Sequence, residues 1–422
     1  MSDCTHCTSG RRDFIKIAFG GGAAAALSGK FMLPSHAETK PAKAKSVILL
    51  WMQGGPSQLD TFDPKPGTDT GGPHKAIETK TPGLVLSEHL PRLSQVSDKF
   101  SVIRTLFSKD PNHDTARYLL HTGYRTDPTI DHPHLGSLLT QELGTKAEGL
   151  PGCITLGKDP GAGSGYLPAE LSPLLIEKVE NPLEDLKLAN GVTSFRLADR
   201  EKLLRAQNEG FAASHAEGRV DSQHKAYERA FALMRSPHLK AFDLTGEKDE
   251  TRKLYGSSGF GRACLMARRL VEAGVRFVEV TLADWDTHSD NFNRSKGLME
   301  QLDPGMTGLL MDLSQRKMLD ETLVVWMGEF GRTPKINGGN GRDHWTRAFC
   351  AALAGGGLAG GRVIGRTNGL GTEPQDRPVS VQDLFATIYG RLGVDTSKKY
   401  MTPLGRPIKI LEGGEPVKEI LS

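Results

Sequence analysis

Short apolar runs that alternate with amphipathic stretches constrain the fold of this chain most strongly. The runs have the composition of buried strands and lie at 45–52, 102–104, 276–282, 322–327 and 349–353. Apolar residues recur with helical periodicity at 262–273, where Gly274 should end the helix, at about 306–317 and at 380–392. Strands that alternate with helices are typical of α/β proteins. We therefore predict a doubly wound, mostly parallel sheet sandwiched by helices.

The composition fits a large folded protein and excludes several other classes. The chain has 422 residues, of which 37% are hydrophobic and 24% are charged, and its net charge is +3. This length allows a large buried core, and the composition excludes a disordered chain, a collagen and a disulfide scaffold. Nearly balanced charge argues against nucleic acid as a partner, because such partners are held by bulk electrostatics. Cys264 and Cys350 lie in apolar patterns that are typical of small buried side chains.

The N-terminal segment has the features of an export signal. Two adjacent arginines, Arg11 and Arg12, precede a Gly/Ala-rich stretch at 17–28, and small residues at 35–37 fit a peptidase site. We predict that residues 1–37 are a twin-arginine signal peptide, read by the twin-arginine translocase during export. The mature protein would then be periplasmic, secreted or on the cell surface, with no membrane span. An ordinary amphipathic N-terminal helix is the alternative.

The remaining chain, 38–422, is predicted to form one α/β domain with a mainly helical insertion at about 157–250. The first part of the insertion, 157–173, is rich in glycine and proline and is predicted to be irregular. Residues 195–239 are charged, and their apolar residues are spaced for one helix face. We expect this insertion to lie over or beside the functional site.

Polar clusters follow three of the predicted strands, and a fourth cluster comes soon afterwards. Their acidic and imidazole residues are Asp60, Asp284, Asp286, His288, Glu329, Asp343 and His344. Ligands of open α/β sheets bind beyond the carboxyl ends of the strands. Carboxylates and imidazoles that meet there favour a site for one or two divalent ions, with Zn, Mn, Ca or Mg as candidates. Each cluster also has a simpler interpretation, as a helix cap, an exposed loop or a local hydrogen-bonded pair.

Five motifs spread over most of the chain carry a resemblance to a known family. They are Gly54–Asp60, Trp285–His288, Gly328–Pro334, Gly341–Trp345 and Ala354–Gly357. Together they resemble an exported, largely uncharacterised family called domain of unknown function 1501. More remotely, the pattern resembles the alkaline phosphatase–sulfatase superfamily.

The superfamily resemblance implies a first set of metal ligands. Asp284 and His288 have the Asp-x3-His spacing of the superfamily, and His344 matches a later histidine of its metal-dependent members. These three residues would hold one ion. Asp286 would bind the same ion directly or orient His288.

A second set of ligands departs from the superfamily pattern. Gln53 stands directly after the first strand, where an aspartate is usual, and Asp60 is displaced by several residues. Glu329 keeps a carboxylate after its strand, but Phe330 replaces the ligand that should follow it. On this resemblance, Asp60 and Glu329, with His113 as a further candidate, would hold the other ion.

The position of the nucleophile differs as well. The segment around His113 resembles the nucleophile region of sulfatases and keeps Arg117 and a Thr-Gly pair at 122–123, but His113 stands where Cys, Ser or Thr should attack. Three alternatives follow: His113 attacks, Thr115 substitutes for it, or His113 is a metal ligand and water attacks. Arg117 and Arg332 are candidates to grip a phosphate or sulfate group, with a structural salt bridge as the alternative for each.

Two functions remain open at this point. The first is an exported, metal-dependent hydrolase of phosphate or sulfate esters, which would act on a small or polymeric anionic substrate. The second is a non-catalytic relative that binds an anionic polysaccharide or a partner at the cell surface.

Overall fold

The computed structural model describes residues 44–421, apart from 185–187, 189 and 213–216. The predicted signal peptide, 1–37, therefore lies outside the described residues. None of the helices in the described part of the chain has the length and apolarity that crossing a bilayer requires.

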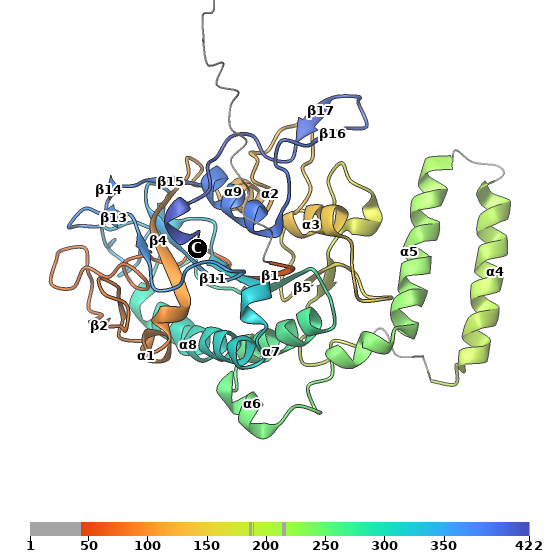
Figure 1. The fold of residues 1–422 in the computed structure, drawn as a ribbon, viewed down its shortest axis with the longest axis horizontal. Helices are drawn as coiled ribbons and strands as arrows, with labels where there is room; N and C mark the ends of the chain where they lie inside the picture. The colour runs from red at the N-terminus through yellow and green to blue at the C-terminus, as the bar shows by residue number, and fades with distance from the viewer. Residues whose placement is uncertain (1–43, 185–187, 189, 213–216, 422) are drawn as a thin grey trace, which may run out of the picture. The chain divides into compact units, whose positions relative to one another are not determined.

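A nine-stranded sheet forms the centre of the described residues, in the order β12-β4-β11-β8-β1-β7-β5-β6, with β15 also paired to β4 (Figure 1). The strands are β1 Ser46–Met52, β4 Phe100–Phe107, β5 Cys153–Leu156, β6 Leu174–Ile176, β7 Phe277–Leu282, β8 Thr322–Met327, β11 Phe349–Gly355, β12 Val363–Ile364 and β15 Val379–Ser380. The central strand β1 is parallel to β7 and to β8, whereas β11 is antiparallel to β4 and β8. The prediction of a mostly parallel sheet is confirmed.

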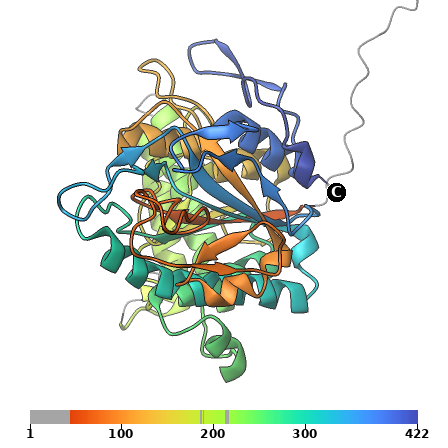
Figure 2. The ribbon, with the colours of Figure 1, turned by 90° about the vertical axis from the view of Figure 1, so that its left-hand side faces the viewer.

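Helices cover both faces of this sheet. The helices are α1 Pro91–Ser94, α2 His113–Thr122, α3 Leu135–Leu143, α4 Ser194–Ala212, α5 Glu217–Arg235, α6 Asp249–Leu254, α7 Gly259–Glu272, α8 Asn291–Gln315 and α9 Val381–Leu392. Figure 2 shows α7 and α8, in teal, on one side of the sheet and α9, in blue, on the other. Apolar side chains of α7 and α8 share one core with the sheet, and those of α2, α3 and α9 share a second core with it.

The sequence of β1 explains why it lies between two layers. Ile48, Leu50 and Met52 point into the first core, and the alternate residues, which include Leu49 and Trp51, point into the second. Successive side chains of a strand point to opposite faces, so a strand that is covered on both faces is apolar throughout. Each residue of β1 is buried.

Two predicted helices illustrate how well local signals locate helix ends. In α7 the Ser258 side chain accepts a hydrogen bond from the Gly261 N–H, and the helix ends just before Gly274, whose φ is +106°. The predicted stop at Gly274 is confirmed. In contrast, α8 begins at Asn291, well before the predicted start near residue 306, and it contains Pro304. A proline inside a helix removes one hydrogen bond, which is why the sequence pattern favours a later start.

The insertion is helical where its charged part predicts helices, in α4 and α5. Lys225 on α5 forms an ion pair with Glu170 (3.2 Å), and Ser236 donates a hydrogen bond to the Glu148 carbonyl (2.7 Å). The cysteines Cys264 and Cys350 are free and buried, as predicted.

Within the described residues, four short antiparallel ladders lie outside the main sheet. They pair β2 Ala76–Glu78 with β3 Val85–Ser87, β9 Gly331–Arg332 with β10 His344–Trp345, β13 Arg366–Thr367 with β14 Pro374–Asp376, and β16 Lys399–Met401 with β17 Pro407–Lys409. The β9–β10 ladder sets His344 opposite Arg332 and so brings together two residues that the sequence singles out.

Candidate active site

The loops that follow β1, β7 and β8 meet around a cavity of about 230 Å³. Its lining residues are Gln53, Gly54, His113, Asp114, Arg117, Lys158, Ala283, Asp284, Asp286 and Glu329. The cavity thus lies beyond the carboxyl ends of three neighbouring strands, where ligands of open α/β sheets bind. In the described residues of α4 and α5, no side chain lines it.

Gly54 allows two of these loops to approach each other closely. Its φ is +111°, and a Cβ atom at this position would lie 2.4 Å from the Asp286 backbone nitrogen. The Gly54 N–H donates a hydrogen bond to Glu329 Oε1 (2.9 Å), and the Trp285 N–H donates one to the Gln53 carbonyl (3.1 Å). A residue without a side chain is therefore required for the ends of β1, β7 and β8 to meet.

Three histidines in this region have one ring nitrogen fixed by an acceptor. His113 Nδ1 lies 2.8 Å from Glu329 Oε1, His288 Nδ1 lies 2.8 Å from Asp343 Oδ1, and His344 Nδ1 lies 2.7 Å from the Pro111 carbonyl oxygen. Because carboxylates and carbonyls only accept, each Nδ1 carries the hydrogen and donates it. In the neutral ring, each Nε2 is left with a lone pair.

These Nε2 atoms converge on Asp286. Asp286 Oδ1 lies 3.4 Å from His113 Nε2, 3.1 Å from His288 Nε2 and 3.5 Å from His344 Nε2. In addition, the Nε2 atoms of His288 and His344 are 3.0 Å apart. Lone pairs that face one another at these distances repel unless a cation lies between them. A metal ion fits this donor set, because metal-binding histidines donate their second ring N–H to a carboxylate or carbonyl.

The surroundings of Asp286, His113 and His344 shift the pKa of each side chain. Burial opposes ionisation of Asp286, but hydrogen bonding and charge from Arg332 lower the pKa of Asp286 below its usual value. The hydrogen bond to Glu329 raises the pKa of His113, whereas burial lowers the pKa of His344. The carboxylate is therefore ionised at neutral pH and His344 is neutral, which are the forms that bind metal.

A second group of donors consists of oxygen atoms. Gln53 Oε1 and Glu329 Oε2 are buried and have no hydrogen-bond partner within the described chain. Both residues line the cavity together with the exposed carboxylate of Asp284. Buried polar atoms without partners are rare in proteins, and oxygen donors suit hard cations such as Mg²⁺ and Ca²⁺. The residues present thus fit one ion on the nitrogen-rich side and one on the oxygen-rich side.

Most of the residues predicted from the sequence meet here. The structure places Asp284, Asp286, His288, Glu329, Asp343 and His344 in or next to this region, together with His113, Arg117 and Arg332. Asp343, a predicted ligand, contacts His288 Nδ1 and so orients that ring. Glu329 orients His113 in the same way through Oε1 and keeps Oε2 free for an ion.

Two predicted residues do not join the group. Asp60 is buried, and its Oδ2 accepts hydrogen bonds from Arg342 Nε (2.8 Å) and Asn291 Nδ2 (2.9 Å). The Thr115 hydroxyl donates to the Asn112 carbonyl (3.4 Å) in the first turn of α2. Neither side chain lines the cavity. The turn that follows Gln53 directs Asp60 toward Arg342, which the sequence pattern does not reveal.

The two arginines that are predicted to grip an anion differ in what they contact. Arg332 is fully buried and donates to Asp286 Oδ1 (2.6 Å) and to the carbonyls of Gly54, Gly55 and Arg342, so its guanidinium is committed to these contacts. Arg117 pairs with Asp114 (3.0 Å), but its Nε has no partner in the described residues.

Lys158 and Gln53 are functional candidates that the sequence patterns do not select as site residues. Lys158 lines the cavity beside Arg117 and follows β5, a short strand that the apolar pattern does not predict. Gln53 stands out in the sequence only for its place where an aspartate is usual. Its position directly after β1 is the signal that could have identified it.

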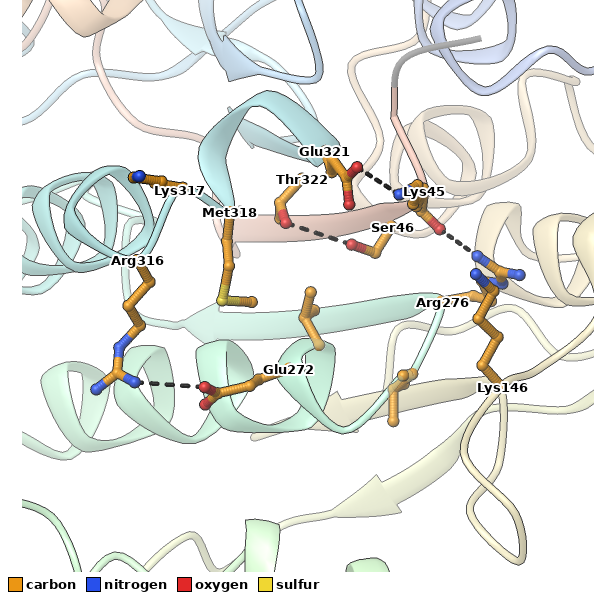
Figure 3. A pocket seen from close by; sticks show the side chains of 13 residues that line it. Lys45, Ser46, Lys146, Glu272, Arg276, Arg316, Lys317, Met318, Glu321 and Thr322 are labelled. Atoms are coloured by element: carbon orange, nitrogen blue, oxygen red, sulfur yellow. Dashed lines mark hydrogen bonds and ion pairs between the residues drawn. The ribbon is translucent and has the colours of Figure 1, made fainter.

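A larger hollow of about 460 Å³ lies at the opposite, amino-terminal edge of the sheet (Figure 3). Its lining contains several lysine and arginine side chains, but most of them form structural contacts. Lys45 pairs with Glu321, Arg316 pairs with Glu272 (3.3 Å), and Arg276 donates to three backbone carbonyls. The smaller cavity is therefore the better candidate, because it contains unpartnered donors and acceptors.

Comparisons with solved structures give remote likenesses, and a comparison with family models gives one family. Among solved structures, the chain is similar to a protein in the alkaline phosphatase superfamily from Vibrio parahaemolyticus, with 11% identity, 91% of this chain and 72% of that chain covered, and a TM-score of 0.41. A phosphonate monoester hydrolase of Agrobacterium radiobacter is 14% identical, with 88% of this chain and 78% of that chain covered and a TM-score of 0.34. A sulfatase from Pseudoalteromonas sp. is 14% identical, with 83% of this chain and 68% of that chain covered and a TM-score of 0.38. A search of curated proteins gave no match.

The model of one protein family, described as a protein of unknown function (DUF1501), matches residues 44–421. The match covers nearly all of the described chain, including the motifs at 54–60, 285–288, 328–334 and 341–345. The chain therefore belongs to the DUF1501 family.

Proposed function

We propose that this protein is a metal-dependent hydrolase of phosphate or sulfate esters. The observation that carries the proposal is the convergence of three imidazole Nε2 atoms on Asp286 Oδ1, each with its Nδ1 held by an acceptor. A bound divalent ion supplies polarisation of an ester oxygen and lowers the pKa of water. Both effects favour hydrolysis of an anionic ester at neutral pH.

The side chains divide into two ligand sets. His113, His288, His344 and Asp286 would hold one ion. Gln53, Asp284 and Glu329 supply oxygen atoms for a second ion. Glu329 contributes to both ion sites. Its Oε1 orients His113, which is a ligand of the first ion, and its Oε2 is available to the second ion.

His113 acts in this proposal as a ligand and not as a nucleophile. Its Nδ1–H is held by Glu329, and its Nε2 faces Asp286 together with the other two imidazoles. Thr115 bonds to the backbone of its own helix and lies outside the cavity lining. Water is therefore the proposed nucleophile, and the ester is cleaved in one displacement that yields the free alcohol and an inorganic anion.

Arg117 and Lys158 are the proposed binding groups for the anionic end of the substrate. Both line the cavity, and a guanidinium and an ammonium group are suitable donors to the oxygens of a phosphate or sulfate group. Their positive charges lie in the same cavity lining as the carboxylates of Asp284 and Asp286. A tetrahedral oxyanion is the chemical class that suits a site with both cationic side chains and bound metal.

We also propose that the protein acts outside the cytoplasm after twin-arginine export. Arg11 and Arg12 support this proposal. Replacing both arginines by lysine should leave the protein in the cytoplasmic fraction with its signal uncleaved. Unchanged export of this variant would contradict the proposed route.

The test of the proposed activity combines metal content with turnover. Purified protein should contain one or two equivalents of a divalent metal and should hydrolyse an aryl phosphate or an aryl sulfate. His288→Ala should lower metal content and abolish turnover, while His238→Ala, in a short helical turn at Pro237–Ala241, should change neither. Unchanged turnover by a folded His288→Ala variant would mean that the site is misplaced.

One observation favours a second candidate function. Among the described residues that line the cavity there is no serine, threonine or cysteine. A protein that kept the metal and anion sites but lost the nucleophile would bind an anionic polysaccharide without cleaving it. Metal-loaded protein that binds a sulfated polysaccharide and turns over neither ester would support this function over the hydrolase.

A further inference from the structure

Three groups of side chains in the described residues bring three potential ligand atoms within 4.8 Å of one another. The first is His113, Asp286 and His344 of the candidate active site. The second is the buried group of His121, His134 and Glu279. The third, formed by His74, Glu88 and His89, flanks the β2–β3 hairpin and takes no part in the proposed hydrolysis.

The buried group is a proton-sharing cluster. The Gly136 N–H donates to His134 Nδ1 (2.9 Å), so this nitrogen is an acceptor and Nε2 must carry the hydrogen that faces Glu279 (3.2 Å). A metal at that Nε2 would require the ring to lose its remaining proton. His121 Nδ1 donates to the Arg117 carbonyl (2.8 Å), and its Nε2 lies 3.3 Å from Glu279. Because the His134 Nε2 is occupied by its hydrogen, the group offers only His121 Nε2 and Glu279 as ligand atoms, fewer than the three protein ligands of a typical zinc site.

The hairpin group has a different geometry. The pairing of Ala76 with Ser87 continues outward, because the Glu88 N–H donates to the Lys75 carbonyl (2.9 Å). This register sets His74 directly opposite His89. Side chains that are directly opposite on antiparallel strands have Cβ atoms only ~5 Å apart. The backbone therefore holds the two imidazoles next to each other, edge to face, with ring centroids 4.5 Å apart and an interplanar angle of 87°.

The side chains complete a three-donor set. His74 Nδ1 and His89 Nε2 are 3.0 Å apart, and the Glu88 carboxylate lies within 4.8 Å of both. Glu88 Oε1 accepts a hydrogen bond from the Lys75 N–H (2.9 Å), which fixes the carboxylate beside the rings. In the described chain, no N–H is directed at the second ring nitrogen of either histidine, and His74 Nε2 is buried without a partner. In the buried group, the N–H that donates to His134 Nδ1 forces the hydrogen onto the other ring nitrogen. No such N–H in the described residues prevents His74 Nδ1 or His89 Nε2 from binding a metal ion.

We propose that His74, Glu88 and His89 bind a divalent transition-metal ion of the Zn²⁺ type at a site separate from the candidate active site. Two imidazoles and one carboxylate, with water in the fourth position, are a common ligand set of this ion. Tetrahedral coordination with Zn–N distances of ~2.0 Å needs the two nitrogens about 0.3 Å farther apart than they stand. The rings are half-buried, so a small rotation of each is enough.

The site would join the two ends of the β2–β3 hairpin next to the start of α8. His74 packs edge-on against Phe292 in the first turn of α8, with ring centroids 5.6 Å apart. The chain just before His74 carries Thr70, whose carbonyl accepts a hydrogen bond from Arg342 (2.8 Å). A metal ion at His74 and His89 would close the loop between these residues, which reduces the entropy of the unfolded chain.

The test measures metal stoichiometry by equilibrium dialysis with Zn²⁺ alone. His89→Ala should bind one equivalent fewer than the unmodified protein and lose the part of its Zn²⁺-dependent thermal stabilisation that this site supplies. His344→Ala should lose metal at the active site but keep this equivalent, and His238→Ala should lose none. The loss in His89→Ala is expected whether or not the protein is a hydrolase.

A second variant covers the case in which His89→Ala does not fold. Glu88→Gln keeps an oxygen that can accept from Lys75 and should weaken Zn²⁺ binding at this site about 10-fold or more. Co²⁺ in place of Zn²⁺ should give a visible absorption band that is reduced in Glu88→Gln and retained in His344→Ala. Equal Zn²⁺ stoichiometry and affinity in the unmodified protein and in both hairpin variants would overturn the proposal.

Discussion

At the scale of single residues, the candidate site depends on side chains that hold the ligands as much as on the ligands themselves. Asp343, Glu329 and the Pro111 carbonyl each fix one imidazole through Nδ1. Without these acceptors the rings could rotate, and their Nε2 atoms would no longer meet at Asp286. The outer partners of a metal site commonly contribute 10-fold to 100-fold in metal affinity.

The first prediction concerns Asp343. Asp343→Asn should weaken metal binding roughly 10-fold to 100-fold, because the neutral amide no longer stabilises the N–H of His288. The side chain is exposed, so the free energy of unfolding of the metal-free protein should change little. Metal titration and urea unfolding check both parts. Asp376→Asn, at an exposed aspartate that pairs with Arg366, is the control and should leave metal affinity unchanged.

The second prediction concerns Gly54. Gly54→Ala should lower the free energy of unfolding by about 3–5 kcal/mol, because its Cβ would overlap the backbone of Trp285 and Asp286. Gly67 also has a positive φ (+77°), but no atom lies within 4 Å of the position that its Cβ would take, so Gly67→Ala should cost only about 1 kcal/mol. Urea unfolding compares the two variants. Equal losses would mean that the loops after β1 and β7 do not meet as described.

At the scale of elements, the buried group of His121, His134 and Glu279 fastens α2 and α3 to β7. Burial alone would raise the pKa of Glu279, but the two histidines together lower it to about 2. Burial lowers the pKa of His134. Since α2 begins at His113, this contact also positions one of the proposed metal ligands.

The third prediction follows from the sign of these shifts. A carboxyl group whose pKa is lower in the folded state stabilises the fold above its ordinary pKa of 4.5, and this contribution is lost as the pH falls from 4.5 toward 2. Glu279→Gln should therefore cost about 3–5 kcal/mol at pH 7 and progressively less below pH 4.5. Urea unfolding at a series of pH values measures the difference. Glu373→Gln, on an exposed loop, is the control, and a pH-independent cost for Glu279→Gln would contradict the lowered pKa of Glu279.

The sequence predicts the central elements of the fold better than the peripheral ones. Strands β1 and β8 are apolar along nearly their whole length and β7 is interrupted only by Glu279 and Thr281, because helices cover both faces, and sequence patterns of this kind predict buried strands. In contrast, α2 is short and polar, and its limits depend on the Asn112 cap and on Gly123 in the left-handed conformation. Such local capping gives a weaker signal than a continuous apolar run.

The site is predictable in its location but only partly in its members. The order of strands places Asp286 and Glu329 at one edge, and this follows from the parallel sheet. The direction of a side chain after a turn does not follow from it, which is why the sequence predicts Asp60 in the site although it bonds to Arg342. For Gln53 the position directly after β1 is readable in the sequence, but the burial of its unpartnered Oε1 becomes apparent only in three dimensions.

At the scale of the whole molecule, bound metal should stabilise the fold, because the ligands come from loops after separate strands and from α2. Metal that binds only the folded state adds about 2.7 kcal/mol when its free concentration is 100 times Kd. The fourth prediction is that a chelator lowers Tm by several degrees and that added Zn²⁺ or Mn²⁺ restores it. If neither chelator nor added metal changes Tm, the proposed ligands do not join distant segments through a metal ion.

The most direct measurement of the central claim is anomalous X-ray diffraction from crystals of the protein grown with Zn²⁺ or Mn²⁺. We expect an anomalous peak at ~2.0–2.2 Å from Nε2 of His113, His288 and His344 and from an oxygen of Asp286. If these four side chains adopt the described positions in such crystals and no peak lies between them, they share protons and not a metal ion, and the proposed hydrolase is contradicted.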